Sequence, residues 1–100
     1  MGRPGPLSAK VVFRIHALRR MFVRSITPAE VRTVIEQGDT IERYPADTPY
    51  PSRLVLGSVS GRALHVVVAD NADDDETIVV TVYEPDPALW QPGFRRRRRP

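Results

Sequence analysis

The residue types best suited to chemistry in this sequence are an arginine, a histidine and a tyrosine from three separate segments: Arg53, His65 and Tyr83. Cleavage of RNA without a metal needs a base for the 2′-hydroxyl, a cation for the phosphate charge and an acid for the leaving oxygen. Arg53 is suited to hold a phosphate, and His65 or Tyr83 to act as general base or acid. These three residues are the candidate catalytic set.

Each of these residues also has a structural interpretation. A histidine inside an apolar strand, such as His65, is equally well explained as a buried side chain that binds a backbone carbonyl. Tyr83 could instead anchor the C-terminal segment against Trp90. Both alternatives stay open at the level of the sequence.

Basic side chains gather in two places. Residues 3–24 hold six Lys/Arg and no acid, and residues 95–99 are five consecutive arginines. Such charges supply most of the affinity for a phosphate backbone. The candidate nucleic-acid-binding residues are therefore His16, Arg19, Arg20, Arg24, Arg95, Arg96 and Arg97. The alternatives are a helix cap at His16, solvated charges at the helical arginines and a solubilising tail at the C-terminus.

The overall charge hides a segregated distribution. The net charge is +3, yet residues 1–94 hold 10 Lys/Arg and 12 Asp/Glu, so the body is acidic and the tail supplies the excess. Five of the acids lie between residues 70 and 76. Because the body is not basic, this balance favours a binding module over a protein that grips RNA across its whole surface.

The composition gives no indication of a metal site, of cysteine chemistry or of a membrane-spanning segment. The sequence has no Cys and only two His, so no metal and no cofactor are expected, and residues 70–76 lack the spacing of a calcium loop. No apolar run approaches the ~20 residues of a membrane helix. Residues 1–9 lack the apolar core of a signal peptide. The cytoplasm is the expected compartment, with no membrane partner.

The apolar pattern predicts a β-α-α-β-β-β-β order. Strands are predicted over residues 10–15, 40–44, 53–59, 63–70 and 77–83, and helices over 16–26 and 28–37. Thr27 and Glu30 are typical of a capping box, and Gly38 of a left-handed helix stop. The prediction is one α+β domain, residues 10–94, with two N-terminal helices packed on an antiparallel sheet. Residues 1–9 are expected to be disordered and residues 95–100 to form a flexible arginine tail.

The turn at residues 60–61 decides whether the candidate catalytic residues share a face. A two-residue loop would set His65 opposite Leu56, whereas a three-residue loop with a left-handed Gly61 would set it opposite Val55, on the face of Arg53. We favour the longer loop, because it keeps the most apolar residues together against the helices. It places four side chains on one accessible sheet surface: Arg53, His65, Thr81 and Tyr83.

Several stretches occur in an order that resembles a known family. HALRRM with Arg24 following, YPADTPYPSRLVLG, GRALHVVVA and TVYEPDPALW resemble the bacterial family called domain of unknown function 4258, over residues 11 to about 90. The resemblance implies a RelE/ParE-type fold and the toxin half of a type II toxin–antitoxin pair, with a zinc-finger or helix-turn-helix antitoxin as partner. It places five residues in recurrent motifs of the family: His16, Arg20, Arg53, His65 and Tyr83.

The leading expectation is a metal-independent, toxin-like protein that cleaves RNA or inhibits translation, with free or ribosome-bound RNA as its target. The alternative is a non-catalytic module of the same fold that binds a protein or a nucleic acid. A third candidate is an oligomerising domain, such as a homodimer formed through an exposed sheet edge.

Overall fold

Five strands and two helices follow one another in the order that the sequence predicts. The computed structural model describes residues 10–99, so the expectations for residues 1–9 and for Pro100 lie outside the described residues. The elements are β1 (Lys10–Phe13), α1 (Ile15–Val23), α2 (Pro28–Gln37), β2 (Asp39–Tyr44), β3 (Ser52–Val59), β4 (Arg62–Asn71) and β5 (Glu76–Tyr83). The α+β class and the β-α-α-β-β-β-β order are confirmed.

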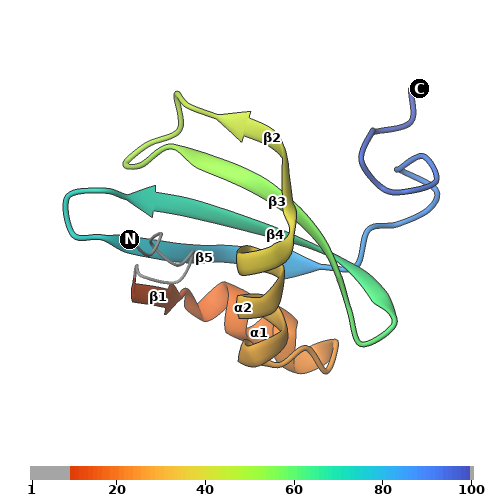
Figure 1. Ribbon diagram of the computed structural model, residues 1–100, viewed down its shortest axis with the longest axis horizontal. Coiled ribbons are helices and arrows are strands. Elements are labelled where there is room, and N and C mark those ends of the chain that lie inside the picture. The colour runs from red at the N-terminus through yellow and green to blue at the C-terminus, as the bar shows by residue number, and fades with distance from the viewer. Residues whose placement is uncertain (1–9, 100) are drawn as a thin grey trace, which may run out of the picture.

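The strands form a single mixed sheet in the order β1-β5-β4-β3-β2 (Figure 1). The neighbours from β2 to β5 are antiparallel, whereas β1 pairs with β5 in parallel, with Lys10 opposite Glu76. The prediction of a wholly antiparallel sheet was therefore wrong at the β1 edge. No hairpin joins β1 to β5, and the long connection between them leaves the chain free to pair in parallel.

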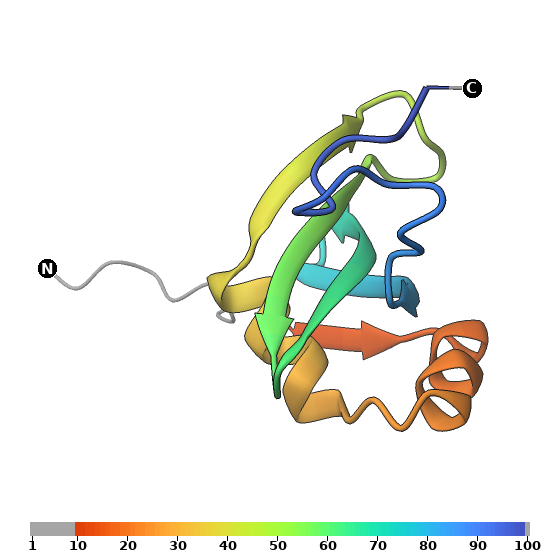
Figure 2. The same ribbon diagram turned by 90° about the vertical axis from the view of Figure 1, so that its right-hand side faces the viewer.

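Both helices cover the same face of the sheet, α1 against β5 and α2 against β3 and β4 (Figure 2). The core between these layers is made of aliphatic side chains, and each valine, leucine, isoleucine or methionine contributes roughly 1.5–3 kcal/mol when fully buried. Its members from the helices and their connection are Ala17, Met21, Ile26, Val31, Val34 and Ile35, and those from the strands are Val55, Leu64, Val66, Val68, Val79 and Val82. No helix within residues 10–99 is long and apolar enough to cross a membrane.

Helix α2 has the predicted bounds and the predicted cap. The amide of Glu30 donates to Thr27 Oγ1 at 3.1 Å, and the amide of Thr27 donates to Glu30 Oε1 at 2.9 Å, which confirms the capping box. Gly38 differs from the prediction, because its backbone is extended rather than left-handed. A Cβ there would lie 2.5 Å from the carbonyl oxygens of Val34 and Leu56, so glycine is needed for a close approach.

Helix α1 is shorter than predicted. It ends at Val23 rather than at Ile26, because Ser25 adopts a left-handed backbone with φ 55°. The amide of Ile26 then donates back to the carbonyl of Met21 at 2.8 Å, which directs Ile26 into the core. The pattern of apolar residues continued past the helix, but the helical backbone did not.

The turn between β3 and β4 is the two-residue loop. Leu56 pairs with His65, and both turn residues, Ser60 with φ 53° and Gly61 with φ 77°, are left-handed. This is the pattern of a type I′ hairpin. The preferred three-residue register was therefore wrong. It assigned the left-handed conformation to Gly61 alone, whereas Ser60 adopts it as well.

A bulge in β5 also changes which residues share a face. Val67 pairs with Thr81 and Val68 pairs with Val79, so one extra residue, Val80, interrupts the alternation. Val79 consequently points into the core, while Thr81 lies on the face away from the helices. A bulge of this kind inserts one residue without a pairing partner and reverses the side-chain pattern beyond it.

The C-terminal segment covers the sheet face opposite the helices (Figure 2). Within it, the amide of Gln91 donates to the carbonyl of Arg96, and the amide of Arg98 to the carbonyl of Leu89, both at 2.8 Å. We refer to residues 89–98 as the C-terminal hairpin. Three arginine side chains of residues 95–99 also bind within the chain, Arg95 to Asp39, Arg97 to Glu42 and Arg98 to the Pro87 carbonyl, which differs from the expectation of a free arginine tail.

Candidate functional site

Arg53 and His65 lie on opposite faces of the sheet. Arg53 pairs across the strands with Val68, whose side chain lies in the core, so Arg53 is on the face that the helices cover. His65 pairs with Leu56, and both lie on the other face. The prediction of one accessible surface carrying Arg53, His65, Thr81 and Tyr83 was therefore wrong. The structure brings His65, Thr81 and Tyr83 to one face, and it separates Arg53 from them.

The guanidinium of Arg53 is held within the protein. Its Nε donates to Asp70 Oδ2 at 2.9 Å and its Nη2 to Asp70 Oδ1 at 3.3 Å, which is a bidentate ion pair. Its Nη1 donates to Thr40 Oγ1 at 3.3 Å. These bonds join β3 to both of its neighbours, and they occupy the groups that a phosphate would need.

His65 has a fully buried side chain with a partner at each ring nitrogen. Its Nε2 lies 2.8 Å from the carbonyl oxygen of Phe94, and its Nδ1 lies 3.2 Å from the hydroxyl of Tyr83. A carbonyl oxygen only accepts, so we assign the proton to Nε2 and let Nδ1 accept from Tyr83. This is the arrangement expected of a structural histidine that binds a backbone carbonyl.

The protonation of this pair follows from its surroundings. Burial lowers the pKa of His65 and Arg97 lowers it further, while the Phe94 carbonyl and Glu42 act in the opposite direction. Burial likewise raises the pKa of the Tyr83 hydroxyl. Both side chains are therefore neutral at pH 7. The one lone pair of the imidazole, on Nδ1, already accepts from Tyr83 inside the protein, so no basic atom of His65 is free to take a proton from a substrate.

Aromatic and charged side chains of the C-terminal hairpin cover His65. The indole of Trp90 meets the imidazole edge-on, with ring centroids 4.4 Å apart, and the Arg97 guanidinium lies 4.6 Å from the centre of the indole. Arg97 also pairs with Glu42 at 3.7 Å, and Arg95 pairs with Asp39 at 3.0 Å. Two of the three tail arginines predicted to bind nucleic acid are thus engaged with β2.

The basic residues predicted on the first helix are exposed. His16, Arg19 and Arg20 lie on α1 and Arg24 directly follows it, and none of their side chains has a hydrogen-bond or ion-pair partner within residues 10–99. The helix itself lacks a side-chain cap. Because α1 and the C-terminal hairpin lie on opposite sides of the sheet, the candidate nucleic-acid-binding residues form two separate groups (Figure 2).

Arg62 is a structurally important residue that the sequence analysis missed. Its guanidinium donates to the carbonyls of Arg24 and Ser25 at 3.1 and 2.8 Å, and to the carboxylates of Glu30 and Glu84 at 3.3 and 3.1 Å. The Ser60 hydroxyl, followed by the Thr27 amide and Arg62, lowers the pKa of Glu30. Nothing in the local sequence signals these partners, because they come from distant segments.

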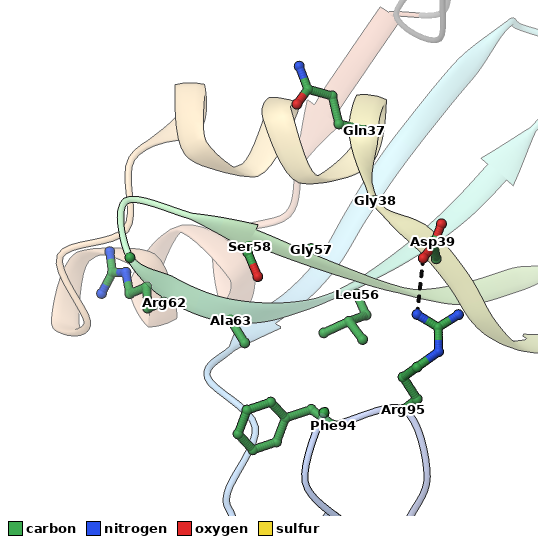
Figure 3. A pocket seen from close by; sticks show the side chains of 12 residues that line it. Gln37, Gly38, Asp39, Leu56, Gly57, Ser58, Arg62, Ala63, Phe94 and Arg95 are labelled. Carbon is green, nitrogen blue, oxygen red and sulfur yellow. Dashed lines mark hydrogen bonds and ion pairs between the residues drawn. The ribbon is translucent and has the colours of Figure 1, made fainter.

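A cavity of about 670 Å³ lies between the C-terminal hairpin and the sheet (Figure 3). Leu56 and Ala63 line it from the sheet, Phe94 lies across from them, and the ion pair of Asp39 with Arg95 stands at one end. Of the candidate site residues only Arg95 lines this cavity. Its lining is mixed, with Leu56, Ala63 and Phe94 beside polar and charged side chains, and it contains neither His65 nor Tyr83.

The fold and the site define a class of protein. It is an α+β domain in which the C-terminal segment of the chain binds and covers a buried histidine. The family described as Domain of unknown function (DUF4258) matches residues 13–84. The chain belongs to this family. The matched residues end before the C-terminal hairpin, so the cover of His65 lies outside the matched part of the chain. No curated protein and no solved structure matches the chain.

Proposed function

We propose that the protein is a non-catalytic module of the DUF4258 family that binds a protein partner. The observation that carries this proposal is the state of His65. The imidazole is fully buried, both its nitrogens are bound, and Arg53 lies on the other face of the sheet with its guanidinium on Asp70. Phosphoryl chemistry needs a base and a cation that converge on one atom, and this arrangement keeps them apart.

The character of the free surface supports a protein partner rather than a nucleic acid. Arg95 and Arg97 are engaged with carboxylates of β2, which removes two charges from the tail. The free arginines of α1 stand beside four large exposed apolar side chains, of which Ile15, Leu18 and Val23 are aliphatic and only Phe22 is aromatic. Nucleic acids are bound by cations and stacked aromatic rings, whereas exposed aliphatic patches are typical of protein interfaces.

An RNA cleavage assay tests the absence of catalysis. The full chain is incubated with single-stranded RNA and with a cell-free translation mixture, and the wild type is compared with the Arg53→Ala and His65→Ala variants. We expect intact RNA, undiminished translation and no difference among the three proteins. Cleavage by the wild type that disappears in either variant would overturn the proposal.

A second candidate function is the toxin-like one, a RelE-type protein that cleaves RNA or blocks translation in the cytoplasm and is neutralised by a zinc-finger or helix-turn-helix antitoxin. The observation that favours it is the contact between His65 and Tyr83 beneath a cover made of C-terminal residues. Loosening that cover in the full chain, with Trp90→Ala and Arg97→Ala together, tests it. This candidate requires RNA cleavage to appear in the double variant and to vanish when His65→Ala is added.

A further inference from the structure

Helix α1 presents a second apolar face that nothing in the described chain covers. Its buried residues are only Ala17 and Met21. Four large apolar side chains on the same helix are exposed, with exposed fractions of 64% for Ile15, 41% for Leu18, 86% for Phe22 and 74% for Val23. A soluble domain rarely leaves so many large apolar side chains together on one helix unless they bind something.

The exposed residues form a continuous stripe. Ile15, Leu18 and Phe22 are spaced i, i+3 and i+7, which places them on one side of a helix. With Arg19 and Val23 they line an open groove of about 590 Å³. Helix α1 lies at the periphery of the molecule in both views (Figures 1 and 2). The spacing and the length of the stripe fit another helix, whose side chains would interlock with it.

The charges around this stripe indicate which charged groups a binding partner must carry. Exposed basic residues flank it, and none has an acidic partner among residues 10–99: Arg14, Arg19, Arg20 and Arg24. A partner therefore has to bring carboxylates beside its apolar residues. Complementary charges at the rim would also steer the two proteins into contact.

We propose that α1 is the docking surface for an acidic amphipathic helix of a partner protein, with its apolar stripe on Phe22 and its carboxylates beside the α1 arginines. This inference rests on the proposed binding function and names its partner class.

Other occupants match these features less well. A second copy packed α1 to α1 would bring two sets of arginines together, which is repulsive. Residues 1–9 contain no acid, and the acidic residues 70–76 contain no large apolar side chain. RNA would match the charges but not the aliphatic part of the stripe, because bases are held by stacking on aromatic rings.

Calorimetric titration of the full chain with synthetic helical peptides tests the proposal. The probe is a peptide of about three heptads with Leu at the a and d positions and Glu elsewhere. One control peptide has Lys in place of Glu, and another has Ser in place of Leu. We expect binding of the acidic peptide, weakened by added salt, and no binding of either control. Equal binding of the Lys peptide would overturn the charge argument.

Matched variants locate the site. Phe22→Ser should weaken binding about tenfold, as loss of a central aromatic anchor does, and Arg19→Glu should weaken it as well. The controls are Leu89→Ser, an apolar residue with an exposed fraction of 59% outside α1, and Arg32→Glu on the exposed side of α2. These controls should bind like the wild type. Equal loss in Leu89→Ser would place the site elsewhere.

The remaining outcomes separate the two proposals. Binding of an RNA oligonucleotide or of anionic vesicles that depends on Phe22, or a dimer that Phe22→Ser dissociates, would assign the face to another partner and overturn this inference. Failure of the acidic peptide with RNA still intact overturns only this inference. RNA cleavage by the wild type overturns the proposed function, whatever the peptide does.

Discussion

The Nε2 atom of His65 donates a hydrogen bond to the carbonyl oxygen of Phe94 at 2.8 Å, and this contact joins β4 to the C-terminal hairpin. It fixes the tautomer, since a carbonyl can only accept. The hydroxyl of Tyr83 then satisfies Nδ1 from β5. Three distant segments therefore depend on one uncharged imidazole, and protonation of His65 would disturb all of them.

We predict that stability falls as the pH is lowered below the ordinary pKa of histidine. Burial lowers the pKa of His65 from 6.5 in the folded state. Below pH 6.5 the unfolded chain therefore binds a proton at His65, whereas the folded chain does not until the pH reaches its lower pKa. The free energy of unfolding is therefore full above pH 6.5 and decreases as the pH falls from 6.5 toward the pKa of the folded state. The slope is at most about 1.4 kcal/mol per pH unit, the value for one proton. Urea unfolding between pH 7.5 and 5 measures it.

The control for this pH dependence is the other histidine. His65→Gln can still donate to the Phe94 carbonyl but does not titrate, so the slope between pH 7.5 and 5 should shrink. His16 is exposed on α1, and His16→Gln should leave the slope unchanged. If His16→Gln removes the slope and His65→Gln keeps it, the assignment to His65 is wrong.

We predict that Arg62 contributes more to stability than any exposed arginine of the helices. Its guanidinium makes four hydrogen bonds to the α1–α2 connection, to Glu30 and to Glu84. Arg62→Ala should cost about 3 kcal/mol of unfolding free energy, because hydrogen bonds to charged groups are lost and the carboxylates stay behind. Arg62→Lys should restore only part, since an ammonium cannot reproduce the planar fork.

The comparison for Arg62 is Arg32 on the exposed side of α2. Arg32→Ala should change stability by no more than about 0.5 kcal/mol. Equilibrium unfolding in urea under one buffer condition measures all three variants. Similar losses for Arg62→Ala and Arg32→Ala would contradict the bridging role of Arg62.

The parts of the fold that local rules govern could be predicted from the sequence. Helix α2 is the clearest case, because Thr27 and Glu30 make their capping contacts within one turn of the chain. The order of the elements follows in the same way, from apolar periodicity and turn residues. These features depend on neighbours a few positions away, which a sequence displays directly.

The candidate site could not be predicted, because two single-residue features decide it. Ser60 adopts a left-handed backbone that is uncommon outside glycine, and this sets the register that separates His65 from Arg53. The bulge at Val80 then reverses the alternation of β5. A shift of one residue moves a side chain to the other face of a sheet, so the apolar pattern alone could not choose.

Contacts between residues far apart in the chain could not be predicted from the sequence either. The partner of Arg95 is Asp39, 56 residues away, and the partner of the His65 imidazole is the Phe94 carbonyl, 29 residues away. A run of like charges predicts a solvated tail. It cannot reveal that acids on β2 lie within reach once the sheet has formed.

We predict that two glycines differ in how strongly they resist substitution, and for different reasons. Gly38→Ala should cost about 1–3 kcal/mol or more, as overpacking does, because the added Cβ would lie 2.5 Å from two backbone carbonyl oxygens. A Cβ at Gly61 would meet no atom within 4 Å apart from its neighbours in the chain, but the φ of 77° disfavours a side chain. Gly61→Ala should therefore cost only about 1 kcal/mol, and Gly61→Asn still less. Thermal melting of the three variants ranks them, and a milder effect at Gly38 would contradict the close approach.

The C-terminal hairpin should be held by Trp90 rather than by its ion pairs. Trp90 has an exposed fraction of 2% and packs on the His65 ring, so Trp90→Ala should cost about 3–5 kcal/mol as other core aromatic truncations do. Both side chains of the Arg95–Asp39 pair are more than half exposed. Arg95→Ala should therefore cost no more than about 1 kcal/mol, the ordinary range of a surface ion pair.

Urea unfolding together with NMR of the His65 ring nitrogens tests this difference. In Trp90→Ala the imidazole gains access to water, so its pKa should rise toward 6.5, because burial is the main cause of its lowering. In Arg95→Ala the protonated Nε2 and the lowered pKa should persist. If Trp90→Ala leaves the His65 pKa low, the hairpin is not what buries the ring, and loosening it could not expose His65 and Tyr83 to any RNA.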